Sequence, residues 1–240
     1  MPRFFKEYFK DAPFIEGDDA RHISRSLRMR VGEALTVCDT MGTDYLCKIA
    51  DIEDGIVRLD VLEETENRTE PTVKVTLFQC NPKGDKLDMV VQKAVELGVS
   101  EIVPVLSEHC VSRPDHKSAD KKRERMSRIA DEAAKQSGRG KIPEIGEFIS
   151  FKACCERLKD VDKSILFYEL GGKPLTEIVE KDTKSIAIVI GPEGGFSKDE
   201  VNLALDSGAE VATLGPRILR TETAPLAAIT AIMLLTDNLN

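Results

Sequence analysis

Two segments near the C-terminus combine glycine, proline and charged residues at a spacing that could build a ligand site. They are I-G-P-E-G-G-F at residues 190–196 and G-P-R-I-L-R-T-E-T-A at residues 215–224. Each directly follows a short apolar run, at residues 186–190 and 211–214, of the kind found in buried parallel strands. Ligands bind at the carboxyl ends of such strands, and glycine lets the backbone approach them closely. The alternative for the glycines alone is an ordinary strand-to-helix turn.

The first segment lacks the signatures of the common phosphate-binding loops. It has no G-x-x-x-x-G-K-[ST], so the lysine and hydroxyl that bind triphosphate and magnesium are missing. It also has no G-x-G-x-x-G with an acidic residue about twenty positions later, which argues against the usual dinucleotide site. Glu193 lies inside the loop, where its carboxylate would repel phosphate. A neutral or cationic ligand, such as a sulfonium, is therefore favoured.

A well-specified helix follows this loop and is expected to fix its position. Ser197 and Glu200 have the spacing of a capping box, Phe196 can pack on Val201, and Gly208 supplies the stop. A loop held between a strand and a capped helix has the rigidity that a binding site requires.

The pattern of the chain changes near residue 70, which predicts two domains. Residues 63–71, E-E-T-E-N-R-T-E-P, are polar and end in proline, so they are expected to form the linker. Short strand-like runs separated by glycines precede this linker and are typical of a small β-barrel. These runs are residues 34–38, 44–49 and 56–62.

After the linker, strands alternate with helices, which predicts an α/β fold with a mainly parallel sheet covered on both faces. The expected strands are residues 73–80, 101–106, 165–168, 186–190 and 211–214, and the expected helices include residues 85–97 and 117–136. A last stretch, residues 225–235, is apolar nearly all round. Such a helix must be covered on all sides, either by the core or by a partner subunit.

The net charge of −8 does not by itself favour a nucleic-acid partner, but the charges are unevenly distributed. Residues 1–30 hold seven Lys or Arg against five Asp or Glu, and residues 112–141 hold ten against five. Residues 31–70 hold three against eleven. Basic segments in an acidic chain are expected where one face meets a polyanion and the rest stays soluble. A solvated helix face is the alternative for the second basic segment.

The cysteines and the hydropathy predict a soluble protein of the reducing cytoplasm. The six cysteines form no C-x-x-C pair, and the charged start M-P-R-F-F-K-E has no apolar signal-peptide stretch. No run approaches the roughly 18 apolar residues that a membrane span needs, so no membrane partner is expected. His109, Cys110 and His116 lack the paired spacing of zinc motifs, so no metal site is expected either.

The two C-terminal segments together resemble the paired signature of the RsmE family, which are SPOUT-class methyltransferases. Weaker matches are R-F-F at residues 3–5, H-x5-R-x-R-x-G at 22–32, Q-K-A-V-E-L-G-V at 92–99 and R-x2-D-E-A-A-K-Q-S-G-R at 128–139. The resemblance covers essentially the whole chain. It implies an enzyme that uses S-adenosylmethionine to methylate N3 of a uridine in the 16S RNA of the small ribosomal subunit.

The same resemblance implies the architecture. Residues 1–70 would form a PUA-like RNA-binding β-barrel, and residues 71–240 would form a SPOUT domain with a trefoil-knotted, mainly parallel sheet. The cofactor would be bound in bent form by the loops of the knot. The protein would act as a homodimer, with its active site at the subunit interface.

The resemblance also implies which residues hold the cofactor. Backbone groups should bind the adenine, with the side chains of Leu214, Ile218 and Leu219 flanking it. The expected cofactor-binding residues are Tyr168, Glu169, Ile190, Gly191, Glu193, Gly194, Gly195, Leu214, Gly215, Ile218 and Leu219. Plain core packing is the alternative for Ile218 and Leu219.

Methyl transfer from a sulfonium is an in-line displacement, so alignment of the nucleophile with the methyl group supplies much of the catalysis. Uracil N3 is a poor nucleophile until its proton leaves, so the site needs a proton acceptor or a cation that stabilises the uracil anion. Arg220 is the candidate cation, and Glu222 is the candidate acceptor or the group that orients Arg220. The alternative is that this segment only begins a helix, with Thr221 or Thr223 as its cap.

Both basic segments are candidates for contacts with RNA phosphates. The expected RNA-binding residues are Arg3, His22, Arg25, Arg28, Arg30, Arg113, Arg128, Gln136 and Arg139. Two other functions stay open: a non-catalytic RNA-binding or ribosome-assembly protein, and a SPOUT methyltransferase that acts on another RNA position. Binding of S-adenosylmethionine separates the first of these from an enzyme.

Overall fold

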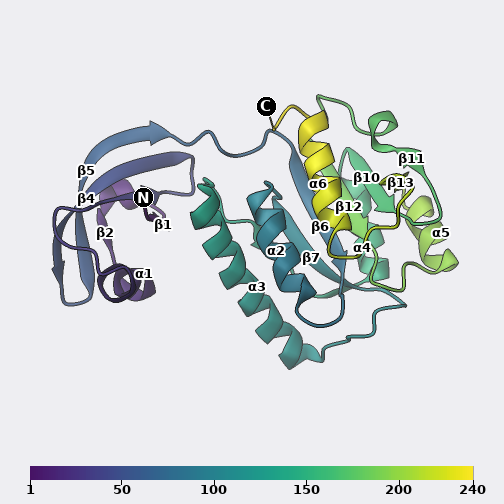
Figure 1. The fold of residues 1–240 in the computed structure, drawn as a ribbon, viewed down its shortest axis with the longest axis horizontal. Coiled ribbons are helices and arrows are strands. Elements are labelled where there is room, and N and C mark those ends of the chain that lie inside the picture. Colours follow the sequence, from purple (N-terminus) through teal and green to yellow (C-terminus); the bar gives the residue numbers. More distant parts are fainter. Residues whose placement is uncertain (240) are drawn as a thin grey trace. The chain divides into compact units, whose positions relative to one another are not determined.

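The computed structural model describes residues 1–239, and the chain divides into two compact units (Figure 1). The first unit comprises residues 1–70 together with residues 134–142. The second comprises residues 71–133 and the chain from residue 143 onward. The segment 134–142 thus belongs to the first unit although it lies in the middle of the sequence, which no local pattern indicates.

The first unit is built on a five-stranded mixed sheet with the order β1-β3-β4-β5-β2. Its strands are β1 (Arg3–Phe5), β2 (Phe14–Ile15), β3 (Ala34–Cys38), β4 (Thr43–Glu53) and β5 (Ile56–Glu66). β1 pairs parallel with β3, and the other pairs are antiparallel. Its short helices are η1 (Phe9–Asp11), α1 (Gly17–Arg21) and η2 (His22–Ser26). Apolar side chains of these strands and helices form one core, which includes Phe4, Phe9, Ile23, Leu35 and Ile49.

Strand β5 extends further than the sequence predicts. The predicted linker begins at residue 63, but residues 63–66 continue β5 and pair with β4, with Thr65 opposite Asp44 and Glu66 opposite Thr43. The side chains of residues 61–66 are exposed. A backbone ladder forms here without an apolar face to bury, so the polar composition of the segment conceals the strand.

The second unit is built on a parallel sheet with the order β11-β13-β10-β12-β6-β7-β8, and β9 also pairs with β7. The strands are β6 (Lys74–Cys80), β7 (Glu101–Leu106), β8 (Glu144–Ile145), β9 (Ile149–Ser150), β10 (Lys163–Phe167), β11 (Lys173–Pro174), β12 (Ser185–Ile190) and β13 (Glu210–Thr213). This order makes β13, β10 and β12 neighbours, and parallel pairing places their carboxyl ends at one edge of the sheet.

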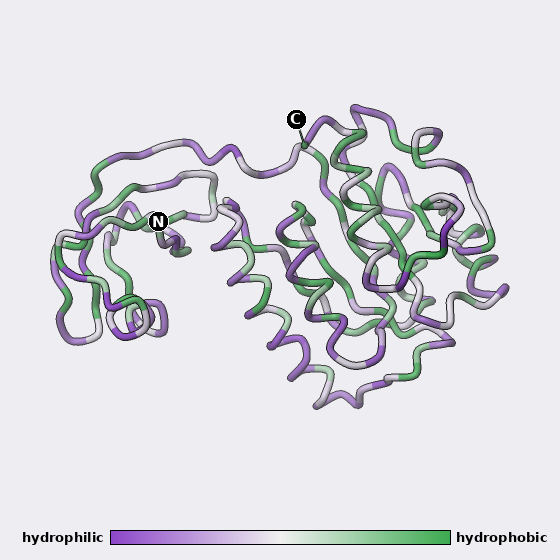
Figure 2. Tube along the Cα trace, in the orientation of Figure 1, coloured by the Kyte–Doolittle hydropathy of each residue, from purple (hydrophilic) through white to green (hydrophobic). Residues whose placement is uncertain are grey.

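Helices cover both faces of this sheet, which confirms the predicted fold class (Figure 1). They are α2 (Lys86–Glu96), α3 (His116–Ser137), α4 (Phe151–Arg157), α5 (Lys198–Asp206) and α6 (Ala224–Leu235), with the single turns η3 (Leu158–Asp160) and η4 (Leu175–Glu177). Cys154 of α4 and Ala204 of α5 pack on one face against Phe78 and Val189. Helix α6 contacts β6, β12 and α2. Hydrophobic residues follow the central strands and α6, whereas most of α3 is hydrophilic (Figure 2).

Helix α6, the apolar helix of the sequence analysis, is covered on only part of its surface in the single chain. Ala228, Ile229, Ile232 and Met233 are buried. Leu234 is 57% exposed, and Thr230 is also exposed. The core therefore accounts for one side of the helix and leaves part of an apolar helix in contact with solvent.

The described residues contain neither a membrane-spanning helix nor a side-chain cluster of the kind that binds metals. No helix among residues 1–239 is long and apolar enough to cross a bilayer. In the same range no three His, Cys, Asp or Glu side chains gather to hold an ion. The six cysteines are free and buried.

Candidate active site

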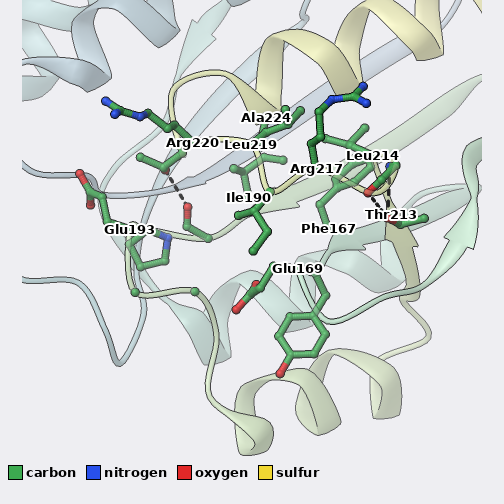
Figure 3. Close-up of a pocket in the computed structure, with 18 of the residues that line it drawn as sticks. Phe167, Glu169, Ile190, Glu193, Thr213, Leu214, Arg217, Leu219, Arg220 and Ala224 are labelled. Carbon is green, nitrogen blue, oxygen red and sulfur yellow. Dashed lines mark hydrogen bonds between the residues drawn. The ribbon is translucent and has the colours of Figure 1, made fainter.

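A cavity of about 560 Å³ lies at the carboxyl ends of β10, β12 and β13 (Figure 3). Phe167 of β10 is opposite Ile190 in one pairing and Ala212 in the other, so the last residues of the three strands reach the same edge. The lining consists of residues 167–169, 190–195 and 213–221, together with Lys86 and Ala224. The volume is in the range of small-molecule sites.

The loop between β12 and α5 turns sharply and depends on its glycines. The amide of Gly195 donates to the carbonyl of Pro192 at 3.0 Å, and Gly195 has φ = +65°. A Cβ at Gly195 would collide with the Glu169 carboxylate, and one at Gly194 would lie 2.9 Å from Cβ of His109. A side chain at either position would therefore displace a neighbour that borders the loop.

Helix α5 begins as the sequence predicts. The amide of Glu200 donates to Ser197 Oγ at 3.3 Å, and the amide of Ser197 donates to Glu200 Oε2 at 3.1 Å, which completes the capping box. Glu200 Oε1 also accepts from the amide of Glu108 at 2.8 Å, which fastens the segment after β7 to this helix. Phe196 is buried against Phe151, with ring centroids 5.5 Å apart. The glycine loop is thus anchored at its C-terminal end.

A buried chain of hydrogen bonds fastens the third lining segment to the glycine loop. Thr221 Oγ1 donates to the carbonyl of Gly191 at 2.7 Å and accepts from Gln79 Nε2 at 3.1 Å. Gln79, at the end of β6, is fully buried, and Thr221 is nearly so. Segments far apart in the sequence therefore close the cavity through one hydroxyl.

Charged side chains gather at one side of the cavity, where Glu193 and Arg220 are seen together (Figure 3). The Lys86 ammonium lies 2.8 Å from Glu193 Oε1 and 3.2 Å from Glu222 Oε2. The Arg220 guanidinium lies 4.0 Å from Glu222 Oε1. The Arg220 side chain is 83% exposed, whereas that of Glu222 is 15% exposed.

The contact between Lys86 and Glu193 shifts the pKa of both groups. The hydrogen bond to Glu193 is the main cause that raises the pKa of Lys86. Partial burial acts to raise the pKa of Glu193, but hydrogen bonds from Lys86 and from backbone amides lower it on balance. Both groups are therefore ionised at neutral pH.

Apolar side chains form the rest of the cavity wall. Ile190 is buried, and Leu214 and Leu219 are half-buried. Ile218 is 79% exposed although it lines the cavity, so core packing does not explain this isoleucine. A large exposed aliphatic side chain at the mouth of a cavity is suited to cover a ligand.

Comparison with known proteins places this geometry in a family. Residues 68–233 match the family described as RNA methyltransferase domain, and residues 15–62 match the one described as RNA methyltransferase PUA domain. The chain is 37% identical to the ribosomal RNA small subunit methyltransferase E of Bacillus subtilis, over 99% of this chain and 98% of the relative. The chain belongs to the ribosomal RNA small subunit methyltransferase E family.

Two solved structures are similar to this chain over nearly its whole length. The enzyme from Neisseria gonorrhoeae, bound to S-adenosyl methionine, has a TM-score of 0.86 and 32% identity, with 98% of both chains covered. A putative methyltransferase from Legionella pneumophila, in complex with the bound cofactor, has a TM-score of 0.87 and 27% identity. That match covers 98% of this chain and 97% of the relative. The RsmE membership and the SPOUT-type fold predicted from the sequence are confirmed.

The structure brings the predicted cofactor residues of this methyltransferase E family member together. Every residue expected to bind the cofactor lines the cavity, and so does Arg220. Glu222 lies beside Arg220, just outside the lining. Sequence reasoning misses Lys86, which is 107 positions from Glu193, and it misses Gln79 for the same reason. Neither belongs to a recognisable local motif.

Most residues predicted to bind RNA are exposed. His22, Arg25, Arg28 and Arg30 are exposed in and just after η2 of the first unit. Arg128 and Gln136 are exposed on α3. Arg113 is exposed too, although its guanidinium donates to the carbonyls of Ser107 and Glu108.

The other two residues predicted to bind RNA, Arg3 and Arg139, are mostly buried and paired within the first unit. Arg3 binds both carboxylate oxygens of Asp44, at 2.5 and 3.0 Å, and donates to the carbonyl of Arg139 at 3.0 Å. Arg139 binds both oxygens of Glu70, and its side chain is 5% exposed. Both guanidiniums bind acceptors inside the first unit. Their contacts hold residues 134–142 against the sheet of that unit.

Proposed function

We propose that this chain transfers a methyl group from S-adenosylmethionine to N3 of a specific uridine in the 16S RNA of the small ribosomal subunit. The observation that carries the proposal is the cavity at the ends of three neighbouring strands, lined by carboxylates and apolar side chains. A family relative with 32% identity is bound to this cofactor. Another relative, with 37% identity, is named as a methyltransferase of the small-subunit ribosomal RNA.

The chemistry of the cavity suits a sulfonium cofactor. The carboxylates of Glu169 and Glu193 border the cavity, where they favour a cation over a phosphate. Leu214 and Leu219, with Ile218 at the mouth, offer apolar surface to a nucleobase. The glycine turn lets backbone groups border the cavity as closely as side chains do. When bound, the cofactor supplies an electrophilic methyl group.

Two side chains are proposed to act on the uracil base. The N3 proton must leave before N3 can attack, and Glu222 accepts it or orients Arg220, whose guanidinium lies 4.0 Å away. Arg220 stabilises the negative charge that develops on the uracil oxygens. Its exposure lets the guanidinium turn toward an incoming nucleotide, whereas Glu222 is held in place.

We further propose a homodimer and a cytoplasmic location. Helix α6 is apolar nearly all round, yet Leu234 is exposed in the single chain, which favours cover by a second copy. Six free, buried cysteines suit a reducing compartment, where ribosomes are also assembled. Sedimentation analysis at micromolar concentration tests the dimer, and a purely monomeric protein would contradict it.

A methylation assay tests the activity directly. Small subunits from cells that lack a methyltransferase of this family would be incubated with the purified chain and isotopically labelled S-adenosylmethionine. Mass spectrometry of the digested RNA should then show N3-methyluridine at one position. Label at another atom or on another RNA would mean that the chain is a methyltransferase with a different target.

The non-catalytic alternative predicts a different result. A ribosome-assembly protein would bind RNA through its basic residues and would have no use for the cofactor. Calorimetry of the purified chain with S-adenosylmethionine separates the two functions. Absence of both heat and thermal stabilisation would favour the assembly protein.

A further inference from the structure

Lys86 joins two carboxylates that come from different segments of the cavity wall. Its ammonium lies 2.8 Å from Glu193 Oε1, in the glycine loop, and 3.2 Å from Glu222 Oε2, in the segment before α6. Lys86 itself is the first residue of α2. One side chain therefore links three elements that the sequence keeps far apart.

The surroundings of this lysine contain few other groups that could hold the carboxylates. Glu193 Oε1 also accepts from the amide of Lys83 at 3.2 Å. Glu222 has Arg220 at 4.0 Å on its other oxygen, and that guanidinium is largely in solvent. The remaining charged side chains that line the cavity are Glu169 and Arg217. The Lys86 ammonium, within 3.2 Å of both carboxylates, is closer to Glu222 than the Arg220 guanidinium is.

We propose that Lys86 is a positioning residue for methyl transfer, which fixes Glu222, and through it Arg220, relative to the glycine loop. The inference rests on the proposed function, because it assigns Lys86 to the geometry of that reaction. The glycine loop borders the cofactor, and the segment with Arg220 faces the base. A contact that spans both sets the distance and angle between donor and acceptor, on which in-line displacement depends.

Lys86 is better placed than Arg220 to support Glu222. The Lys86 ammonium lies 3.2 Å from one Glu222 oxygen, whereas the largely exposed Arg220 guanidinium lies 4.0 Å from the other. Lys86 is anchored in a helix, and its side chain is less exposed than that of Arg220. The division of labour leaves one cation to hold Glu222 and the other to meet the substrate.

Removal of the ammonium has a defined electrostatic consequence. Glu193 and Glu222 would then face each other across the space of the lost side chain, with no cation between them. Two partly buried carboxylates in that arrangement repel each other, which favours displacement of one of them into solvent. Such a displacement releases Glu222 from the position that orients Arg220.

The kinetic test compares three variants. Lys86→Met removes the charge and keeps the length, Lys86→Arg restores a cation, and Lys93→Met is the matched control on the same helix. Lys93 binds Glu96 at 2.8 Å and does not line the cavity. We expect Lys86→Met to lower kcat by about 10- to 100-fold, with a smaller change in KM for the cofactor. Lys86→Arg should recover most of the rate, and Lys93→Met should match the wild type.

A second measurement needs no activity. Chemical denaturation of Lys86→Met, Glu222→Gln and the double variant, all without cofactor, gives the coupling between the two residues. We expect each single substitution to change the folding equilibrium constant, and the double variant to change it by less than the product of the two effects.

The two measurements separate failure of the inference from failure of the function. A wild-type protein without methyl transfer would overturn the proposed function. The denaturation cycle would still measure whether Lys86 and Glu222 interact. An active wild type with Lys86→Met within threefold of its kcat would overturn the positioning role. Effects that simply multiply in the double variant would overturn the contact itself.

Discussion

Arg220 and Glu222 are two positions apart, yet they meet solvent to very different extents. An exposed arginine that reaches one carboxylate at 4.0 Å contributes little to folding stability. Its position at the cavity lining is better suited to contact with a substrate than to support of the fold. Glu222 is the reverse case, since a partly buried carboxylate beside Lys86 is fixed by the protein itself.

Replacement of Arg220 by alanine should separate catalysis from folding. We expect the rate of methyl transfer to fall by about 100- to 1,000-fold, because a cation that meets developing charge is lost. Thermal unfolding and cofactor affinity should stay close to the wild type. Rates are measured with labelled cofactor under single-turnover conditions, and full activity in this variant would remove Arg220 from the mechanism.

Two glycine substitutions should separate backbone strain from the site. Gly195 has φ = +65° and faces the Glu169 carboxylate, whereas Gly208 has φ = +89° with open space around it. Alanine at either position should cost about 1 kcal/mol of stability, because a Cβ disfavours this backbone region. Only Gly195→Ala should weaken cofactor binding, at least tenfold by calorimetry, because Glu169 must move away. Equal affinities in the two variants would show that Glu169 does not matter for binding.

At the scale of elements, the cavity exists because three strand ends are held together after the strands stop. The capping box fixes the loop after β12 to α5, and Thr221 fixes the segment after β13 to Gly191. Gln79 supports Thr221 from the end of β6. The loops that line the cavity thus gain the rigidity of the sheet without being part of it.

Thr221→Val should loosen this closure. The substitution keeps the shape but leaves the Gly191 carbonyl without its donor, so we expect a loss of about 1–3 kcal/mol in urea denaturation and weaker cofactor binding. Thr236→Val is the matched control, because Thr236 is also buried and donates to the Ile232 carbonyl at 2.8 Å outside the cavity. The control should lose stability only. Unchanged cofactor affinity in Thr221→Val would mean that the segment is held by other contacts.

The sequence predicts the elements of this site better than their connections. Periodicity locates β12, β13 and the capped start of α5, since each signal lies within a few neighbouring residues. The contacts of Lys86 and Gln79 join positions more than 100 residues apart, and no local pattern encodes them. The neighbouring order of β13, β10 and β12 is likewise a property of the folded sheet.

The sequence also does not predict which charged side chains are buried in ion pairs. Arg3 and Arg139 lie in basic segments and share the composition of RNA-binding residues. Their partners, Asp44 and Glu70, come from acidic stretches of the first unit. A pairing across such distances becomes visible only when the chain is folded. The exposed strand at residues 63–66 was concealed for the opposite reason, because it buries nothing.

At the scale of the whole molecule, residues 134–142 make the first unit discontinuous. The carbonyl of Gly140 accepts from Cys38 Sγ at 3.3 Å, and the amide of Gly140 donates to Glu70 at 3.0 Å. The Arg139 ion pair lies beside these contacts. The end of the central helical segment is therefore part of the structure that the N-terminal strands build.

Arg139→Ala should unfold the first unit more easily. Loss of one partner from a nearly buried ion pair should cost about 3 kcal/mol, because Glu70 is left without its cation. Arg68→Ala, which breaks an exposed pair with Glu66, should cost less than about 1 kcal/mol. Tyrosine fluorescence during urea denaturation, measured in a Tyr168→Phe background, reports on this unit, since the other two tyrosines, Tyr8 and Tyr45, lie in it. Equal losses in the two variants would refute a structural role for Arg139.

RNA affinity should depend steeply on salt. Each phosphate contact releases counterions, so alanine at Arg25, Arg28 and Arg30 together should reduce the slope of log K against log salt by about 3. Filter binding between low and moderate salt measures the slope. Arg3→Ala should leave it unchanged, because that guanidinium is bound to Asp44. A flat dependence in the wild type would exclude phosphate contacts as the source of affinity.

The discontinuous first unit also sets an order on biosynthesis. A ribosome releases the N-terminal strands early, and domains at that end usually fold before the rest has been made. Here the nascent polypeptide must extend past residue 142 before Arg139 can reach Glu70 and residues 134–142 can complete the first unit. The first unit therefore cannot finish folding until residues 71–133 of the second unit have left the exit tunnel.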